Sequence, residues 1–291
     1  MKYIIGFIVF FYLWVPFISF ADAKADTNIP GEKMPASAKE SFNKGQRHFI
    51  NKEFDEAIGA YTQAIESDPS YPDAYNNRGA AYAAKGEVDK AIEDYNEAIA
   101  LDPAYPAAYY NRGISYANKK QYDKAINDYS KSLSMEPNNA KAYTNRGTAY
   151  YDAGNEAKAI EDYNKAVTID PKFARAYYYR GLIYANKGEY DAAITDFNKA
   201  VAINASYPEA LNNRGSVHAM KKQYDQAIAD YNKAINIDPN YAQAYHGSGT
   251  AYYKKGLYDK ALKDYNKAIF INQNFAEAYY GRGAVYFKSG D

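Results

Sequence analysis

Residues 72–105, PDAYNNRGAAYAAKGEVDKAIEDYNEAIALDPAY, are the stretch of sequence that decides the fold. Gly79, Ala91 and Tyr95 in this stretch each recur at intervals of 34 residues, without a single insertion. Self-similarity at a fixed period of this length is the signature of a repeat architecture. If the positions of each repeat are numbered 1–34 from Ala38, the glycine column occupies position 8 in every copy. Its members are Gly45, Gly79, Gly113, Gly147, Gly181, Gly215, Gly249 and Gly283.

Each repeat contains two stretches with helical spacing. Positions 4, 8 and 11 hold Tyr75, Gly79 and Tyr82, which share one face of a helix because they are three or four residues apart. Positions 20, 24 and 27 form a matching stripe of Ala, Tyr and Ala. A glycine inside a helix costs about 1 kcal/mol relative to alanine, so a glycine in every copy implies a close helix contact. The pattern predicts an all-α fold of antiparallel helix hairpins.

Prolines mark the ends of these helices. Asp-Pro pairs such as Asp102-Pro103 end the second helix of a repeat, because proline cannot continue a helix. Pro72, Pro106 and Pro208 then stand at the first position of the next repeat, where proline suits a helix start.

This pattern resembles the tetratricopeptide repeat family. The resemblance covers residues 38–291 and rests on Tyr at positions 4, 11 and 24, Gly at 8, Ala at 20 and 27, and Pro at 32. It implies a right-handed α-solenoid superhelix whose first helices line a concave groove. A few copies depart from the pattern, with His48 and His218 at position 11 and Ser41 and Leu211 at position 4, which suggests locally looser packing.

The register divides the chain into an N-terminal segment (1–23), a linker (24–37) and a repeat array (38–291). The array comprises seven full repeats and a partial eighth, with boundaries at 38–71, 72–105, 106–139, 140–173, 174–207, 208–241, 242–275 and 276–291.

The N-terminal segment has the composition of an export signal. Lys2 is followed by an uncharged apolar run over residues 3–20, and small residues near Ala21 suit a signal peptidase. The run is also just long enough to span a bilayer, so a retained anchor is the alternative to a cleaved signal peptide. Both interpretations predict an extracytoplasmic protein, periplasmic or secreted, that contacts a membrane only if residues 3–20 are retained.

Composition excludes several classes of function. The 35 basic and 35 acidic residues balance, which removes the field that nucleic-acid binding requires. Without cysteine there is no disulfide, thiolate nucleophile or Cys-ligated zinc. The three histidines have no partners at metal-ligand spacing. We therefore expect no cofactor, no metal and no enzymatic activity.

Arginine at position 7 and aspartate at position 23 form two further columns. One interpretation is a row of arginines that awaits an anionic ligand. The other, which we favour, is a set of internal bidentate ion pairs. The number of arginines and aspartates left without a partner weakly favours pairing within one hairpin over pairing between consecutive repeats. The ten residues assigned to these pairs are Arg78, Asp94, Arg112, Asp128, Arg146, Asp162, Arg180, Asp196, Arg214 and Asp230.

The first helices carry a second stripe, which varies from copy to copy and which the resemblance places in the groove. Its rings and amides would suit an extended peptide. The alternative is that these rings pack on neighbouring repeats and the asparagines bridge adjacent helices. The candidate ligand-binding residues are Asn77, Tyr110, Asn111, Ile114, Asn145, Tyr151, Tyr178, Tyr179, Leu182 and Asn213.

The leading functional expectation is a non-enzymatic scaffold that binds a protein or peptide. The alternatives are a carbohydrate-binding or regulatory module of a cell-envelope assembly, and the repeat arm of a longer enzyme. Relatives that grip acidic C-terminal tails use a lysine, asparagine and arginine cluster, which this chain lacks. The apolar residues of 276–291 either cap the array or make its C-terminal end a site of self-association.

Overall fold

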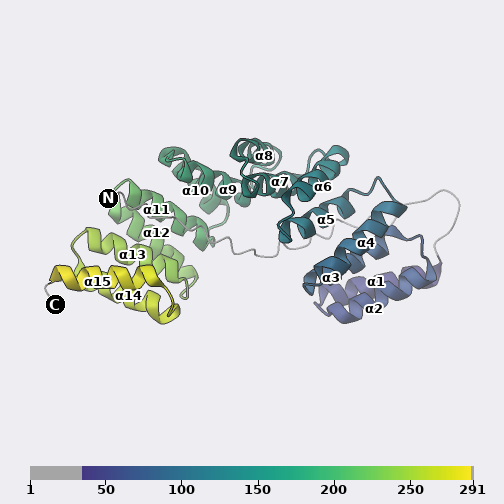
Figure 1. Ribbon diagram of the computed structural model, residues 1–291, viewed down its shortest axis with the longest axis horizontal. Coiled ribbons are helices and arrows are strands. Elements are labelled where there is room, and N and C mark those ends of the chain that lie inside the picture. Colours follow the sequence, from purple (N-terminus) through teal and green to yellow (C-terminus); the bar gives the residue numbers. More distant parts are fainter. Residues whose placement is uncertain (1–34, 290–291) are drawn as a thin grey trace. The chain divides into compact units, whose positions relative to one another are not determined.

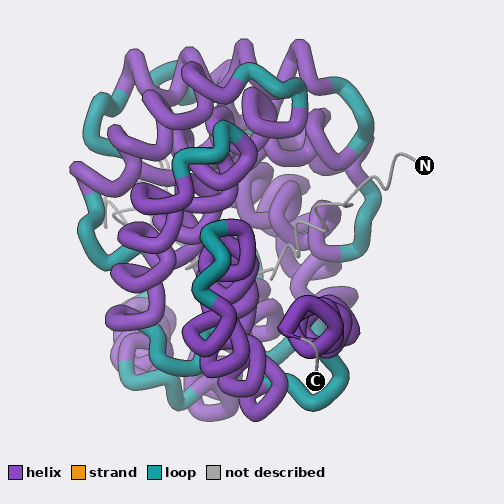
Figure 2. The backbone as a smooth tube through the Cα atoms, turned by 90° about the vertical axis from the view of Figure 1, so that its left-hand side faces the viewer, coloured by secondary structure: helices purple, strands orange, loops and turns teal. Residues whose placement is uncertain are grey.

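The computed structural model describes residues 35–289, and all regular structure among them is helical (Figures 1 and 2). Fifteen α-helices follow one another there with no strand, which confirms the predicted all-α solenoid of tandem helix hairpins. No helix in this part of the chain has the length and apolarity needed to cross a bilayer. The predicted export or anchor segment, residues 1–23, lies outside the described residues.

The described residues form two compact units, 35–153 and 154–289. In the first unit, α1 pairs with α2, α3 with α4 and α5 with α6, and α7 packs on α6. The bounds of these helices are α1 (Ala36–Ile50), α2 (Phe54–Ser67), α3 (Pro72–Ala84), α4 (Val88–Leu101), α5 (Pro106–Asn118), α6 (Tyr122–Met135) and α7 (Ala140–Asp152).

The second unit repeats the scheme. Here α8 packs on α9, which pairs with α10, α11 pairs with α12 and α13 with α14, and α15 packs on α14. The bounds are α8 (Glu156–Ile169), α9 (Ala174–Asn186), α10 (Tyr190–Ile203), α11 (Pro208–Met220), α12 (Tyr224–Ile237), α13 (Ala242–Lys254), α14 (Tyr258–Ile271) and α15 (Ala276–Ser289).

The first helix of each repeat after the first begins on position 1 of that repeat, where α3, α5 and α11 carry proline. Six of the seven described second helices, all except α6, end at an Asp or Asn with extended backbone whose side chain closes a small turn. At the end of α4, Oδ1 of Asp102 accepts a hydrogen bond from the backbone N–H of Ala104, at 2.9 Å. Such local bonds compete with a further helical turn, so the chain reverses at this point.

The tight turn within each hairpin requires a left-handed residue at position 15. Gly86 adopts it with φ 83° and Lys120 with φ 57°. A residue with a side chain is strained in this conformation, which explains why glycine is common at this position.

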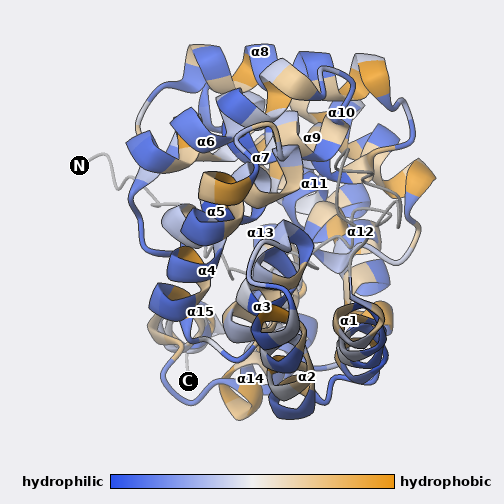
Figure 3. Cartoon of the chain, turned by 90° about the vertical axis from the view of Figure 1, so that its right-hand side faces the viewer, coloured by the Kyte–Doolittle hydropathy of each residue, from blue (hydrophilic) through white to orange (hydrophobic). Residues whose placement is uncertain are grey.

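A glycine of the first helix meets a ring of the second at the centre of each hairpin that lies within one unit. A Cβ added to Gly45 would lie 2.6 Å from the ring of Tyr61, and one added to Gly113 would lie 2.8 Å from that of Tyr129. These distances are below van der Waals contact, so the helices approach closely only because position 8 has no side chain. The ribbon of each helix mixes hydrophobic and hydrophilic residues, as expected for helices with one packed and one solvated face (Figure 3).

Candidate functional site

The arginine column makes bidentate ion pairs within single hairpins. In each of four hairpins, Nε and Nη2 of the arginine donate to Oδ2 and Oδ1 of the aspartate at position 23, over 2.5–2.9 Å. The arginine side chains are 13–18 % exposed and those of the aspartates 2–7 %. The four pairs are Arg78 with Asp94, Arg112 with Asp128, Arg180 with Asp196 and Arg214 with Asp230.

Six guanidinium groups of the arginine column also reach the preceding hairpin. In each case Nη1 donates to the side chain at position 25 of the preceding second helix, so that one arginine joins helices of two repeats. These bonds run from Arg78 to Thr62 (3.2 Å), Arg112 to Asn96 (2.7 Å), Arg146 to Ser130 (3.0 Å), Arg180 to Asn164 (2.5 Å), Arg214 to Asn198 (2.7 Å) and Arg282 to Asn266 (2.8 Å).

Arg146 and Asp162 belong to different units. Arg146 lies in α7 over the rings of Tyr143 and Tyr150, and Asp162 is buried on α8. In the seventh repeat Ser248 replaces the arginine. Burial then raises the pKa of Asp264, the aspartate at position 23 of that repeat.

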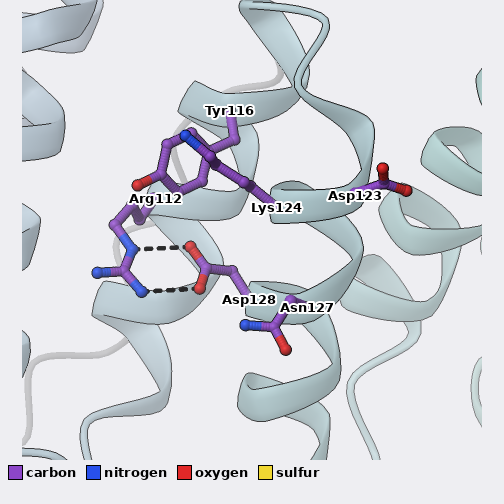
Figure 4. Close-up of a pocket in the computed structure, with 6 residues that line it drawn as sticks. All are labelled: Arg112, Tyr116, Asp123, Lys124, Asn127 and Asp128. Carbon is purple, nitrogen blue, oxygen red and sulfur yellow. Dashed lines mark hydrogen bonds and ion pairs between the residues drawn. The ribbon is translucent and has the colours of Figure 1, made fainter.

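A surface pocket beside the arginine column illustrates why the column is a poor anion site. Arg112, Tyr116, Asp123, Lys124, Asn127 and Asp128 line it (Figure 4). Nζ of Lys124 lies 5.2 Å from the centroid of the Tyr116 ring, and Cζ of Arg112 lies 5.8 Å from the same centroid. Asp128 occupies two of the donors of Arg112, and the two cations and two carboxylates of the pocket balance. No excess positive charge is left for an anionic ligand.

The structure revises the expected groove surface. Six of the ten candidate ligand-binding residues are only 5–9 % exposed, so their side chains pack between helices. The other four, Asn145, Tyr151, Tyr179 and Asn213, are half-buried. The six buried residues are Asn77, Tyr110, Asn111, Ile114, Tyr178 and Leu182.

Several asparagines of this set bridge neighbouring repeats. Nδ2 of Asn145 donates to the hydroxyl of Tyr110 at 2.9 Å, and Nδ2 of Asn213 donates to the hydroxyl of Tyr178 at 3.1 Å. Asn111 donates in the same way to Asn76, at 3.0 Å. In each pair the two residues are 35 positions apart, and this recurring interval was the signal in the sequence that could have predicted the contact.

Four tyrosines gather in the second unit, and we call Tyr178, Tyr179, Tyr207 and Tyr241 the tyrosine cluster. The rings of Tyr178 and Tyr207 lie 4.9 Å apart and those of Tyr178 and Tyr179 lie 5.3 Å apart. Tyr207 and Tyr241 immediately precede α11 and α13, and both are half-buried. Sequence reasoning missed these two residues because position 34 falls in the loop between repeats, outside both helical stripes.

Charge and burial both act on the tyrosine cluster. Desolvation raises the pKa values of Tyr178, Tyr207 and Tyr241, and the nearby Glu209 carboxylate raises them further. Arg175 acts in the opposite direction on Tyr207, and its guanidinium lies over the ring of Tyr179 at 5.7 Å. The hydroxyls of these three tyrosines therefore remain protonated, as hydrogen-bond donors, at every physiological pH.

The histidines do not form a reactive centre in the described residues. Nδ1 of His48 lies 2.6 Å from Glu53, and Nδ1 of His218 lies 2.8 Å from Gln223. His246 packs against the rings of Tyr265 and Phe275, and burial lowers its pKa. Within residues 35–289 no group of three or more His, Asp or Glu side chains is placed to hold a metal ion.

Comparison with protein families identifies the repeat. The family described as "TPR repeat" matches residues 45–86, 79–120, 147–188, 181–222, 220–256 and 249–290, and that described as "Tetratricopeptide repeat" matches 106–139 and 129–161. These matches cover most of the chain. The protein belongs to the tetratricopeptide repeat family.

Solved structures of other tetratricopeptide repeat (TPR) proteins resemble this TPR chain. The crystal structure of MamA shares 36 % identity with a TM-score of 0.52, over 57 % of this chain and 96 % of MamA. YrrB, described as a TPR protein with an unusual peptide-binding site, shares 27 % identity with a TM-score of 0.52, over 64 % of this chain and 96 % of its own. PilF of Pseudomonas aeruginosa, at 18 % identity and a TM-score of 0.66 over 75 % of this chain and 98 % of its own, shows the fold alone. No curated protein matches the sequence.

Membership of the TPR family makes this array a scaffold for protein interaction. Because the packing of the array already occupies the arginine column and the six buried stripe residues, the side chains still open to a partner must be sought elsewhere. In the second unit, the half-buried Tyr207 and Tyr241 of the tyrosine cluster lie near the exposed Glu209 and are the most distinctive group of this kind.

Proposed function

We propose that this TPR protein binds an extended segment of a partner protein, without catalysis, through the tyrosine cluster and the first helices that carry it. The observation that supports this most is the gathering of four tyrosines beside Arg175 and Glu209 in a neutral, cysteine-free array. Tyrosine rings give a ligand large contact area at a low cost in conformational entropy, and their hydroxyls fix its orientation. The unusual peptide-binding site ascribed to YrrB supports this proposal by analogy.

The proposal includes a location outside the cytoplasm. It rests on the apolar run of residues 3–20 and the small residues that follow it. A fusion of the chain to a reporter enzyme that is active only outside the cytoplasm tests this part. The fusion is expected to be active with residues 1–23 and inactive without them, and activity without these residues would contradict the proposed export.

A carbohydrate ligand is the second candidate, because hydroxyl and amide groups beside aromatic rings also suit sugars. Self-association is a further part of the partner proposal, since Tyr280 is 81 % exposed and Phe287 is 84 % exposed on α15. Exposed apolar patches of this kind mark contact sites. Sedimentation of the purified chain before and after Phe287→Gln tests it, with a loss of dimers expected and a monomer in both cases contradicting it.

Selection from a random peptide library on the immobilised full chain tests peptide binding. Enriched peptides are expected to bind the wild type and to bind Tyr207→Ala/Tyr241→Ala more weakly. The matched control is Tyr190→Phe/Tyr224→Phe, which removes two hydroxyls at the starts of α10 and α12 in the same unit. Circular dichroism checks that each variant is folded. The proposal fails if no peptide is enriched, or if a glycan array binds the chain while peptides do not.

A further inference from the structure

Two hydroxyls of the tyrosine cluster have no hydrogen-bond partner in the described part of the chain. The Tyr178 hydroxyl accepts from Asn213, but those of Tyr207 and Tyr241 bond to no residue within 35–289. Neither is among the fully buried unpartnered polar atoms, so both reach the surface. They are donors with a free hydrogen, held by half-buried rings.

In the first unit, the hydroxyl of the equivalent tyrosine has a hydrogen-bond partner. There Tyr105, at the same position 34, donates its hydroxyl hydrogen to Oδ1 of Asp73 at 2.6 Å. Asp73 stands at position 2 of the repeat that ends with Tyr105. In the repeat that ends with Tyr207, position 2 is Arg175. An arginine has no acceptor atom, so this exchange leaves the Tyr207 hydroxyl open.

The remaining polar groups of the cluster are also mostly donors. Nδ2 of Asn213 uses one of its two hydrogens on Tyr178 and keeps the other. Glu209, close to Tyr178, Tyr207 and Tyr241, is the nearby acceptor that carries charge. A matching ligand therefore presents unpaired acceptors and flat apolar faces, with a basic residue towards Glu209.

Proline-rich segments have this chemistry. A polyproline II helix has no internal hydrogen bonds, so its carbonyl groups are free to accept, and proline itself offers no N–H. Its rings pack on aromatic side chains, and its low conformational entropy favours binding. We propose that the tyrosine cluster recognises a proline-rich segment in polyproline II conformation, with one proline on each of Tyr207 and Tyr241.

The spacing of the repeats fits this ligand. Tyr207 and Tyr241 hold the same position before α11 and α13, two first helices that contact each other. Packed helices lie about 8–10 Å apart. One turn of polyproline II spans three residues of about 3.1 Å each, or roughly 9 Å. Prolines at every third residue would therefore meet successive tyrosines along one face of the peptide.

Two other modes of peptide recognition fit less well. Strand addition needs an open sheet edge, and the described residues contain no strand. A helical ligand needs a continuous apolar groove for its residues at i, i+4 and i+7. The apolar residues of the variable stripe on the first helices, such as Leu182, are instead buried between helices.

This inference rests on the proposed function, and calorimetric titration of the full chain separates the two. The probes are a peptide with proline at every third residue over about four turns, the same peptide with each proline changed to alanine, and a helix-forming peptide. The wild type is expected to bind the first probe at least tenfold more tightly than the other two. Tyr207→Phe/Tyr241→Phe keeps the rings and is expected to lower that affinity about tenfold, whereas Tyr190→Phe/Tyr224→Phe is expected to leave it unchanged.

Three outcomes would overturn the inference. Equal binding of the proline and alanine peptides would contradict a polyproline II ligand but would leave the proposed peptide binding intact. An unchanged affinity in Tyr207→Phe/Tyr241→Phe would place the site away from the two hydroxyls. If none of the three probes bound, and library selection also failed, the proposed function would fall together with the inference.

Discussion

Gly247 lies so close to Tyr231 that a Cβ added to the glycine would come within 2.5 Å of Cζ of the ring. Gly247 is at position 6 of its repeat, in α13, where earlier repeats carry asparagine or tyrosine. Tyr231 is 3 % exposed, and its hydroxyl lies 3.1 Å from that of Ser216. The contact joins two consecutive hairpins through a buried ring.

Gly247→Ala is expected to destabilise the second unit by about 1–3 kcal/mol, because the added methyl group overpacks a buried ring. Gly59, in the middle of α2, is the matched control, since a Cβ there meets nothing within 4 Å. Gly59→Ala is expected to stabilise the chain by up to about 1 kcal/mol through helix propensity. Urea unfolding followed by circular dichroism measures both effects, and equal effects of the two substitutions would contradict the packing argument.

Asp196→Ala is expected to destabilise the chain by about 2–3 kcal/mol, because it leaves the largely buried guanidinium of Arg180 without its carboxylate. Arg180→Met/Asp196→Leu removes both charges and is expected to recover most of this loss. The exposed pair of Lys221 and Asp191 provides the control, since Asp191→Ala breaks an ion pair in solvent and should leave the unfolding midpoint unchanged. Similar losses from both aspartates would show that burial does not govern the arginine column.

Ser248→Arg is expected to complete the arginine column, with Asp264 and Asn232 as its partners. Burial raises the pKa of Asp264 against a smaller opposing effect of a hydrogen bond to Ser248, which means that its ionised carboxylate destabilises the fold above its folded pKa. The new arginine should lower that pKa and stabilise the unit by about 1–3 kcal/mol at pH 7. Since a lowered pKa contributes stability that is lost as pH falls through it, the gain should shrink towards about pH 3. A gain that is independent of pH would rule out an ion pair.

His246 is expected to make the second unit sensitive to acid. Burial between Tyr265 and Phe275 lowers its pKa from 6.5, against a weaker opposing effect of Glu277. The unfolded chain therefore takes up a proton first, and stability falls as pH drops below about 6.5, by at most about 1.4 kcal/mol per unit of pH. His246→Phe keeps a ring in this space. The difference between the unfolding free energies of wild type and variant, measured from about pH 7.5 to about pH 5, should follow that slope, and a constant difference would contradict it.

The spacing of 34 residues predicted antiparallel helix hairpins, because Gly45 and its equivalents imply a close contact between two helices, and the superhelical fold followed from the resemblance to the tetratricopeptide repeat family. It could not predict which stripe residues face a ligand. Helical periodicity gives the direction of a side chain around its own axis, but not the neighbouring helix that covers it. Tyr110 and Tyr178 lie against the ring at position 24 of their own hairpin, Tyr129 and Phe197 respectively. An asparagine of the next repeat also bonds each hydroxyl, and both tyrosines are buried.

The third hydrogen bond of the arginines was missed for a related reason. The partners at position 25, such as Asn96 and Asn198, recur with the same period of 34 as the arginines. We matched the arginines only with residues of opposite charge, so we did not consider the neutral side chains at position 25. Two columns that recur with the same period are candidates for contact whether or not they carry charge. Tyr207 and Tyr241 of the second unit also belong to a recurring column, at position 34.

Each arginine that bonds both its own hairpin and the one before it makes the junctions between repeats chemically alike. A hairpin with arginine at position 7, aspartate at position 23 and an amide or hydroxyl at position 25 can follow or precede any other of the same kind. The molecule can therefore change its length in evolution by whole units of 34 residues, since duplication or loss of one unit recreates a junction that already works. A binding surface carried by a single repeat can in this way be multiplied, moved or spaced without a new interface having to arise.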